Sequence, residues 1–410
     1  MNVKKLLPLM DGYKDYIIYL QRELTKRPAI SPLSGGDGEY DKAMWLKEEL
    51  KKYKFDRVEE INATDPKAKN GVRPNIVAIY RGLNADKTVW IMSHLDIVPP
   101  GEMSMWKSDP YELVVDGDKL IGRGVEDNQQ AIVASLIVAK VLMDNDIRPD
   151  YNLGLLFCAD EETGSGFGAD WVVEKRKDLF GPKDMFFVPD SGVEDGSMIE
   201  IAEKSILWLK VKTVGKQCHA SRPQIGINAF KAASELVCKV EKLYKIFKHK
   251  DSLYEPPIST FEPTKKEANV PNVNTIPGED VFYIDMRVMP VYKLEEVEKE
   301  LRKMADEVEK KYNVKISFEY LQKSQAAPPT DPKSDIVIAL KKSIKEVLGV
   351  KPKVYGIGGG TVAAFFRRLN LPTVVYSKLN ESAHQPNEWC YISNIISDAK
   401  VFLSAIGKIK

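Results

Sequence analysis

Four short, largely apolar runs, each followed within two residues by a polar or acidic side chain, stand out in the pattern of hydrophobic and polar positions. They lie at residues 88–93, 153–158, 185–188 and 373–376. Runs of this length that end in polar or turn-forming residues are typical of buried strands. A longer run of small and apolar residues, 131–142, predicts a buried helix. The pattern therefore predicts several buried strands and at least one buried helix.

Side chains that bind metals well lie close to the ends of these predicted elements. They are His94, Asp127, Glu162, Asp190 and His384. The chain contains four histidines, and two of them fall in this set. Taken singly, each position also suits a structural role, such as a solvated turn, a helix cap or an acidic surface loop. Imidazole and carboxylate groups together suit zinc, and the set as a whole predicts a two-metal hydrolase site.

Further carboxylates lie next to this set. Asp96 is two residues after His94, and residues two apart on an extended chain point the same way. Asp96 can therefore orient the imidazole and raise its basicity. Asp160, Glu161 and Glu162 are consecutive, which is costly unless cations neutralise them. Because neighbours on an extended chain face opposite ways, one of Glu161 and Glu162 can bind metal while the other acts as the general base.

The motifs around these residues follow one another in a definite order. They are His-Leu-Asp at 94–96, Gly-Arg-Gly-x-x-Asp at 122–127, Asp-Glu-Glu-x-Gly at 160–164, Pro-Asp-Ser-Gly at 189–192 and Ser-Ala-His at 382–384. The ordered set resembles the carboxypeptidase G, acetylornithine deacetylase and succinyl-diaminopimelate desuccinylase family of dinuclear zinc metallohydrolases, over nearly the whole chain. One departure is the pair Gln129 and Gln130, where the family commonly has lysine and glycine.

The resemblance implies a set of metal ligands. Asp127 would bridge two divalent ions, most readily Zn²⁺, although the same ligands accept Co²⁺ or Mn²⁺. His94 and Asp190 would complete one metal site, and Glu162 and His384 the other. Two ions held in this way can polarise a carbonyl group and activate a shared water.

The resemblance also implies the catalytic groups around that water. Glu161 would be the general base, and Asp96 would be the partner that orients the imidazole of His94. The substitution of Gln129 and Gln130 for the usual lysine and glycine would change local contacts to substrate or solvent but would leave the ligands intact.

The segment 203–322 has a self-contained pattern of its own. Its predicted elements are strands at 206–214 and 280–289 and helices at 227–247 and 294–312. It falls between Asp190 and His384, so it reads as an inserted domain of strand-helix-strand-strand-helix-strand type. The resemblance implies that it is a ferredoxin-like α+β lid through which two chains form a homodimer. Residues 1–202 and 323–410 would form the α/β catalytic domain, a zinc-exopeptidase-like mixed sheet flanked by helices.

Three residues of this inserted segment match family positions that contact substrate. His219 lies in a polar loop, and the matching histidine of the family reaches the scissile carbonyl oxygen, often from the partner subunit, where it would stabilise the oxyanion. Asn274 and Arg287 match lid positions that bind substrate, and an arginine fork suits a carboxylate. A surface histidine and an ordinary charge at a strand edge are the structural alternatives for His219 and Arg287.

A glycine-rich turn follows a predicted strand late in the chain, in the segment 354–366. A G-x-G-x-x-G dinucleotide fingerprint that began at Gly356 would need its third glycine at position 361, which is a threonine. The segment is therefore not interpreted as a dinucleotide-binding site. A glycine loop before a helix still offers backbone N–H groups to an anion. Gly359, Gly360 and Thr361 are therefore interpreted as binding the α-carboxylate of the substrate, as the similar loop of the family does.

Composition narrows the class of protein further. The chain has 410 residues, 43% of them hydrophobic, which suits two domains with full cores. Its formal net charge of +1 offers no positively charged surface that would indicate binding of nucleic acid. No apolar run approaches the ~20 residues of a membrane span, and the first residues lack the sustained apolar core of a signal peptide. The four cysteines have no paired spacing, so they are interpreted as reduced thiols of a cytoplasmic protein.

These residues together predict a metal-dependent hydrolase that cleaves the amide bond of an N-acyl amino acid or short peptide with a free carboxylate. Acetyl, succinyl and aminoacyl groups are all compatible with them. An aminopeptidase with a similar dinuclear site is one alternative, and it predicts an acidic anchor for a free amino group. A non-catalytic metal-binding or ligand-binding protein is the other alternative. The presence of Glu161 beside all five predicted ligands argues against that second alternative.

Overall fold

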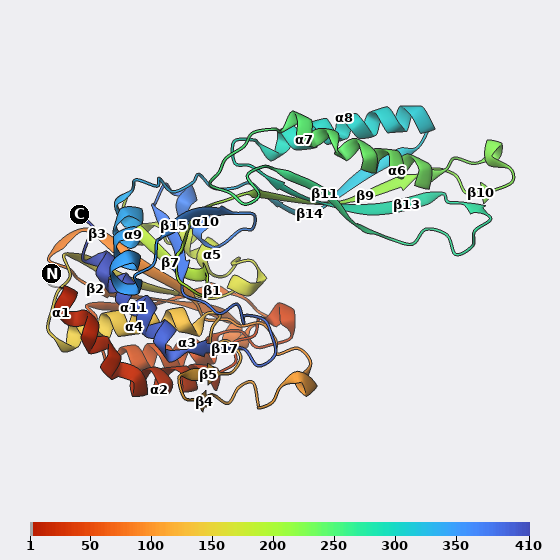
Figure 1. Ribbon diagram of the computed structural model, residues 1–410. Coiled ribbons are helices and arrows are strands. Elements are labelled where there is room, and N and C mark those ends of the chain that lie inside the picture. The colour runs from red at the N-terminus through yellow and green to blue at the C-terminus, as the bar shows by residue number, and fades with distance from the viewer. Residues whose placement is uncertain (1–2) are drawn as a thin grey trace. The chain divides into compact units, whose positions relative to one another are not determined.

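The computed structural model describes residues 3–410, which form two compact units (Figure 1). The larger unit contains the described residues up to Ile201, together with Pro329–Val354 and Thr361–Lys410. The smaller unit contains Ala202–Pro328 and Tyr355–Gly360. None of the described helices is long and apolar enough to cross a lipid bilayer.

A mixed eight-stranded sheet, in the order β1-β2-β6-β3-β7-β16-β8-β15, organises the larger unit. The strands in this order are β1 Arg57–Thr64, β2 Val72–Tyr80, β6 Tyr151–Cys158, β3 Asn84–His94, β7 Met185–Gly192, β16 Thr373–Ser377, β8 Met198–Glu203 and β15 Lys353–Ile357. The four strands predicted from apolar runs are β3, β6, β7 and β16, which are neighbours and run parallel to one another. Their carboxyl ends therefore meet at one edge of the sheet, where ligands bind in sheets of this kind.

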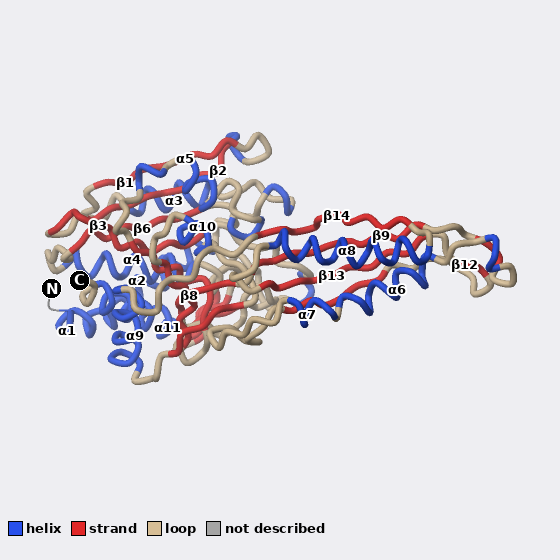
Figure 2. The backbone as a smooth tube through the Cα atoms, turned by 90° about the horizontal axis from the view of Figure 1, so that it is seen from above, coloured by secondary structure: helices blue, strands red, loops and turns tan. Residues whose placement is uncertain are grey.

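Helices cover both faces of this sheet (Figure 2). They are α1 Val3–Leu6, α2 Lys14–Thr25, α3 Tyr40–Leu50, α4 Gln129–Asp144, α5 Ala169–Lys175, α9 Asp335–Leu348, α10 Ala363–Arg368 and α11 Ile392–Ile406. Phe186 stacks on Phe366 of α10 at 4.0 Å between ring centroids, whereas the next residue, Phe187, meets Phe402 of α11 at 5.5 Å. Adjacent residues on a strand point to opposite faces, so α10 and α11 lie on opposite sides of the sheet.

The buried helix predicted at 131–142 is α4. Fourteen of its sixteen residues are buried, and it packs against α11 and α2. A three-stranded sheet of β17 Trp389–Tyr391, β5 Lys119–Ile121 and β4 Val114–Asp116 completes the larger unit. All four cysteines are free thiols.

The smaller unit is a four-stranded antiparallel sheet in the order β11-β13-β9-β14, with helices packed on one face. Its elements are β9 Ser205–Val214, β11 Thr260–Lys266, β13 Glu279–Val288, β14 Lys315–Ser324, α6 Ala229–Val240, α7 Lys242–Ile246 and α8 Leu294–Tyr312. Leu207, Leu209 and Val211 alternate along β9 and point into the core beneath these helices. The single helix predicted at 227–247 is interrupted at Glu241, between α6 and α7.

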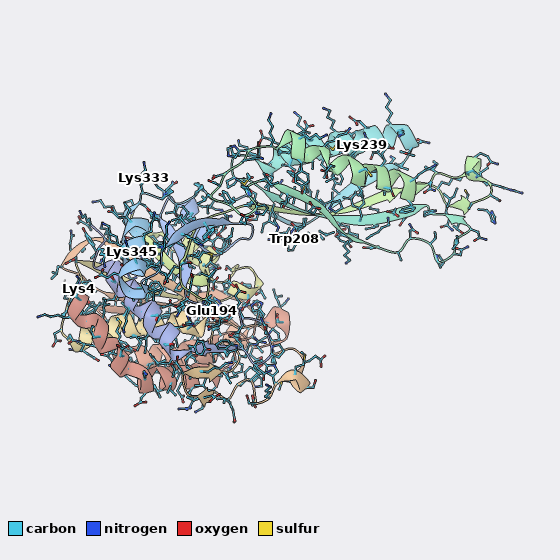
Figure 3. All side chains as sticks on the ribbon, viewed as in Figure 1. Lys4, Glu194, Trp208, Lys239, Lys333 and Lys345 are labelled. Atoms are coloured by element: carbon cyan, nitrogen blue, oxygen red, sulfur yellow. The ribbon has the colours of Figure 1, made fainter. Side chains whose placement is uncertain are left out.

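These observations confirm the predicted fold class, a mixed sheet flanked by helices with an inserted ferredoxin-like α+β unit. The order of the four strands in the smaller unit is that of a ferredoxin-like sheet. Lysine side chains lie on helices of both units, among them Lys239 on α6 and Lys345 on α9 (Figure 3).

Candidate metal centre

The predicted metal ligands come from the carboxyl edge of the central strands and from the loops that follow. His94 is the last residue of β3, and Asp190 lies inside β7. Asp127 precedes α4, Glu162 lies in the turn after β6, and His384 lies in the loop after β16. The prediction that Asp190 follows its strand is wrong by two residues, because β7 continues to Gly192.

That extension of β7 depends on a close approach at its end. Gly192 pairs with Ser377 of β16, and a Cβ at this glycine would lie 1.8 Å from the carbonyl oxygen of Ser377. Only a residue without a side chain fits there. The glycine of the Pro-Asp-Ser-Gly motif therefore lets the two strands remain paired just beyond Asp190.

Asp127 lies between the two histidines of the set. Its Oδ1 is 2.9 Å from Nε2 of His94, and its Oδ2 is 3.1 Å from Nε2 of His384. His94 Nε2 is also 3.3 Å from Oδ1 of Asp190, and His384 Nε2 is 3.1 Å from Oε2 of Glu162. The structure thus gathers all five predicted ligands into two groups that share Asp127.

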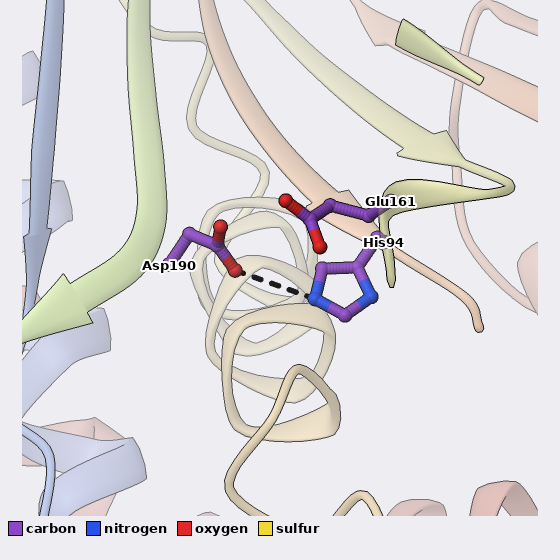
Figure 4. A group of neighbouring side chains, drawn as sticks. All are labelled: His94, Glu161 and Asp190. Atoms are coloured by element: carbon purple, nitrogen blue, oxygen red, sulfur yellow. Dashed lines mark ion pairs between the residues drawn. The ribbon is translucent and has the colours of Figure 1, made fainter. Parts of the chain in front are cut away.

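Two overlapping sets of side chains within the described residues could each hold an ion. One is His94 with Asp127 and Glu162, and the other is His94 with Glu161 and Asp190, with ligand atoms within 4.8 Å of one another in each set. Figure 4 shows the second set, with the carboxylate of Glu161 above the imidazole ring and that of Asp190 beside it, where the dashed line marks the ion pair of Asp190 with His94. Glu161, the predicted base, is therefore near enough to His94 and Asp190 to be a ligand as well.

The electrostatics of this cluster suit bound cations. Burial, followed by repulsion from Asp190, raises the pKa of Glu161 well above its usual range. Burial also raises the pKa of Glu162. Burial alone would lower the pKa of His94, but its hydrogen bonds with carboxylates, Asp127 first, raise it well above its usual range. Carboxylates outnumber histidines, and a donor set of oxygen and imidazole nitrogen fits divalent metal ions, zinc in particular.

Asp96 does more than the sequence predicted. One of its oxygens lies 3.3 Å from Nδ1 of His94, and its main-chain oxygen lies 3.1 Å from the same nitrogen. Its two carboxylate oxygens also accept hydrogen bonds from the backbone N–H groups of Glu161 and Glu162, at 3.0 and 2.9 Å. Asp96 is completely buried. It therefore orients both the imidazole and the turn that carries the two glutamates.

The prediction that Glu161 and Glu162 lie on an extended chain is wrong. Asp160 adopts a left-handed conformation, with φ 61° and ψ 23°, and begins a 3-10 turn over Glu161–Thr163. Its carboxylate accepts a hydrogen bond from the backbone of Phe167 at 3.0 Å and pairs with the buried Arg73 at 3.1 Å. Arg73, which also pairs with Glu39, is therefore the cationic partner of the first of the three consecutive carboxylates.

Asn128 is a functional candidate that sequence reasoning missed. Its Oδ1 accepts a hydrogen bond from the backbone of His94 at 3.3 Å, and its Nδ2 donates to Oδ1 of Asp190 at 3.0 Å. The same amide group donates to the carbonyl oxygen of Pro189 at 2.9 Å. Asn128 thus ties together the ends of β3 and β7. Its position directly after Asp127 was the signal that could have identified it.

The residues predicted to contact the substrate from the inserted segment belong to the smaller unit. His219 and Asn274 lie at a two-stranded ribbon of β10 Cys218–His219 and β12 Thr275–Ile276. The backbone of Ala220 donates to the carbonyl oxygen of Asn274 at 2.8 Å, so the two predicted residues are neighbours. His219 is exposed, and its Nδ1 lies 2.7 Å from Oγ of Ser221.

Arg287 and the glycine loop also adjoin within the smaller unit. Nη1 of Arg287 donates to the carbonyl oxygen of Gly358 at 2.9 Å, next to Gly359 and Gly360. Its Nε and Nη2 donate to the two oxygens of Asp285 at 2.6 and 3.0 Å. Part of the fork that was predicted for a substrate carboxylate is thus already engaged by a carboxylate of the protein.

Thr361 belongs to the larger unit and lies two residues before the helix α10 that follows the glycine turn. Its Oγ1 accepts a hydrogen bond from the backbone of Ala363 at 3.2 Å. The hydroxyl oxygen of Thr361 therefore already has a partner within the protein. The predicted order of strand, glycine turn and helix is confirmed by β15 and α10.

Metal loading is expected to release protons. Hydrogen bonds to Asp127 and Glu162 raise the pKa of His384 to about 10, so this ring is protonated at pH 7 in the metal-free protein. An ion requires the neutral ring, and binding must therefore displace the proton. The apparent metal affinity should rise with pH up to about 10. Calorimetry in two buffers of different ionisation enthalpy measures the protons released, and identical heats in both buffers would contradict the expectation.

The fold and this cluster define the class of protein as a metallohydrolase, and comparison with known proteins gives its family. The model of peptidase family M20/M25/M40 matches residues 90–408, and the chain belongs to this family. An uncharacterized metallohydrolase of Methanocaldococcus jannaschii is 41% identical over 406 residues, covering 94% of this chain and 97% of the relative.

Two further comparisons extend the likeness. A succinyl-diaminopimelate desuccinylase of Orientia tsutsugamushi is 25% identical, covering 96% of each chain. The crystal structure of the aminopeptidase PepT from Bacillus cereus has the same fold, with a TM-score of 0.76 at 16% identity, covering 97% of this chain and 98% of that chain. These findings confirm the family resemblance, and the protein is an enzyme that hydrolyses amide bonds.

Proposed function

We propose that the enzyme hydrolyses the amide bond of N-acyl amino acids or short peptides that carry a free carboxylate next to that bond. The observation that carries the proposal is the position of Asp127, whose two oxygens face two different histidines. A carboxylate so placed suits a bridge between two divalent ions. We assign His94 and Asp190 to one ion and Glu162 and His384 to the other. Zn²⁺ suits these ligands best, and Co²⁺ or Mn²⁺ would also be accepted.

Glu161 is the proposed general base. When bound, two divalent ions polarise the amide carbonyl and make the attacking water more acidic. Glu161 takes the proton from that water and then delivers it to the nitrogen of the leaving amine. In the metal-free protein its burial and the repulsion from Asp190 raise the pKa of Glu161, and bound cations would lower that pKa again and favour the carboxylate that the first step needs. Asp96 supports this role because it fixes the backbone of Glu161.

The smaller unit is proposed to act as a lid that supplies substrate contacts. Arg287, with the N–H groups not used by Asp285 and Gly358, would bind the substrate carboxylate together with Gly359, Gly360 and Thr361. His219 and Asn274, adjacent on the ribbon, would approach the scissile carbonyl oxygen, with His219 stabilising the oxyanion. Closure of such a lid would exclude water from the reacting groups.

Two properties of the whole molecule complete the proposal. The smaller unit is proposed to join two chains in a homodimer, and a monomeric mass in sedimentation at micromolar concentration would contradict this. The four free thiols suit a reducing, cytoplasmic location.

A substrate panel tests the proposed specificity. The metal-loaded enzyme is assayed with N-acetyl and N-succinyl amino acids and with dipeptides. Each substrate is tested unmodified and with its carboxylate amidated, and the dipeptides are also tested with the amino group acetylated. We expect amidation of the carboxylate to abolish most turnover and acetylation of the amino group to be tolerated. The reverse result would identify an aminopeptidase that recognises a free amino group.

His219→Ala is expected to lower kcat by roughly 10²- to 10³-fold, the usual cost of removing one oxyanion donor. KM and the metal content should change little, because His219 is assigned no metal and no ground-state contact. The exposed His249, a lysine-flanked histidine of the same unit, provides the matched control as His249→Ala. A kcat equal in the two variants would remove His219 from the mechanism.

A further inference from the structure

We propose that Glu126 and Glu388 are positioning residues that lock the loop carrying His384 to the loop carrying Asp127, and that Glu126 sets the affinity of the ion held by Glu162 and His384. The inference rests on the proposed two-ion centre. Neither residue contacts the reacting atoms in this account. Each acts through the backbone of the loop opposite its own.

Glu126 reaches from the Asp127 loop into the His384 loop. One of its oxygens accepts hydrogen bonds from the backbone and the side chain of Asn380, the latter at 3.2 Å. The other oxygen accepts from the backbone of Ser382 at 2.6 Å and from its Oγ at 2.7 Å. Glu126 is 2% exposed, so these four donors replace the water that the carboxylate loses on burial.

Glu388 reaches in the opposite direction. It closes the His384 loop, and its carboxylate accepts hydrogen bonds from the backbone of Gly124 at 2.8 Å, of Glu126 at 2.9 Å and of Asp127 at 3.0 Å. Nη1 of Arg123 donates to the same carboxylate at 2.8 Å, and Glu388 is 1% exposed. Each loop therefore contributes one buried carboxylate that accepts hydrogen bonds from backbone N–H groups of the other loop.

A third contact fixes the start of the His384 loop. Nε2 of Gln130 donates to the carbonyl oxygen of Lys378 at 2.8 Å and to Oδ2 of Asp398 at 2.8 Å. Asp398 in turn accepts a hydrogen bond from the backbone of Lys378 at 3.0 Å. Gln130 belongs to the pair that stands where the family resemblance would place lysine and glycine. The loop is thus held at its beginning, its middle and its end.

The two proposed ion sites differ in how much they depend on this lock. His94 is the last residue of β3 and is 2% exposed, and Asp190 lies inside β7, although the pairing of β7 with β16 is irregular between Val188 and Gly192. His384 has a side chain that is 55% exposed and a left-handed backbone, with φ 63°. The contacts of its Nε2 are with Asp127 and Glu162, the groups with which it would share an ion. The position of its ring therefore depends on the backbone of the loop, which Glu126 holds two residues away at Ser382.

The test is a stepwise titration of the metal-stripped protein with Co²⁺, followed by visible absorption and calorimetry. Glu126→Ala is expected to weaken binding of the second ion by about 10- to 100-fold, the usual cost of removing a group that supports a ligand, and to leave the first ion unchanged. Glu126→Gln keeps one acceptor oxygen and should give a smaller loss. A shifted Co²⁺ absorption band for the second ion alone would show that His384 has moved.

Asp184→Asn provides the matched control in the same unit. Asp184 is also a buried carboxylate, 2% exposed, and accepts from the backbone of Thr88, the indole of Trp90 and the backbone of Gly181 at 2.7, 2.8 and 3.0 Å. Its loss should lower the melting temperature without changing either metal affinity. If Glu126→Ala does not fold, Ser382→Ala, which removes one donor to Glu126, carries the same test with a smaller expected loss.

Equal weakening of both ions, or unchanged affinity for both despite a lower melting temperature, would overturn the inference. Failure of the proposed function is distinct from this result. In that case the wild-type protein itself would bind fewer than two ions, or would bind two and hydrolyse no amide.

Discussion

Glu161→Gln is expected to lower kcat by about 10²- to 10⁴-fold, the range that general acid–base catalysis contributes. Glutamine has nearly the shape of glutamate but cannot take a proton from water or return one to the amine. The backbone N–H of residue 161 would still bind Asp96, so the turn should keep its conformation. KM should change little. Steady-state kinetics with an N-acyl amino acid measure both quantities.

The metal content of this variant decides between two roles for Glu161. The side chain lies within ligand distance of His94 and Asp190, so it could hold an ion as well as move a proton. If Glu161 is only the base, Glu161→Gln keeps the wild-type metal content. If Glu161 is a metal ligand, the variant binds less metal. Glu174→Gln, the same substitution at an exposed position of α5, is the matched control. Loss of an ion together with turnover would contradict the assignment of Glu161 as the base.

Asp127→Asn is expected to have the larger effect, with loss of both ions and a fall in kcat on the order of 10⁴-fold or more, since both metal activation and the positioned water are lost. The amide offers one neutral oxygen where the carboxylate offers two charged ones. Because Asp127 is the group shared by the two histidines, no other ligand should compensate for it. Metal analysis after dialysis, alongside turnover, measures the result.

Asp184→Asn again serves as the control, because it removes a buried carboxylate of the same unit that is not in the cluster. Retention of two ions by Asp127→Asn would show that the bridging role is wrong. Loss of only one ion would show that Asp127 belongs to a single site.

The central strands were predictable because their burial on both faces leaves a continuous apolar run. β3, β6, β7 and β16 each follow this rule, and the polar residue that ends each run marks the edge of the sheet. Four of the five proposed ligands could be identified for the same reason, since they lie in or after the carboxyl-terminal parts of these strands, whereas Asp127 comes just before the buried helix α4. Their grouping around Asp127 could not be read from periodicity and came from the family resemblance.

The ion pair of Asp160 with Arg73 was beyond sequence reasoning. Arg73 lies on β2, far from Asp160 along the chain, and only the sheet brings them together. The consecutive acids at 160–162 therefore looked alike, although the first is structural and turns the chain. The extended geometry assumed for Glu161 and Glu162 failed because that turn comes before them.

The contacts of Arg287 and Glu126 differ in whether the sequence could have predicted them. Asp285 is two residues before Arg287 on a strand that the sequence predicted, so their pairing on one face was accessible from spacing alone. Glu126 meets Ser382 from more than two hundred residues away, through two irregular loops that no periodicity describes. Long-range contacts of this kind determine how the site is held, and they require the structure.

The measurement that tests the account most directly is the recovery of amide hydrolysis by the metal-stripped enzyme as Zn²⁺ or Co²⁺ is added, with bound metal counted at each step. The account predicts that turnover of an N-acyl amino acid or dipeptide returns fully only as the second ion binds. Full activity with a single ion, or two bound ions with no hydrolysis of any amide in the panel, would contradict it.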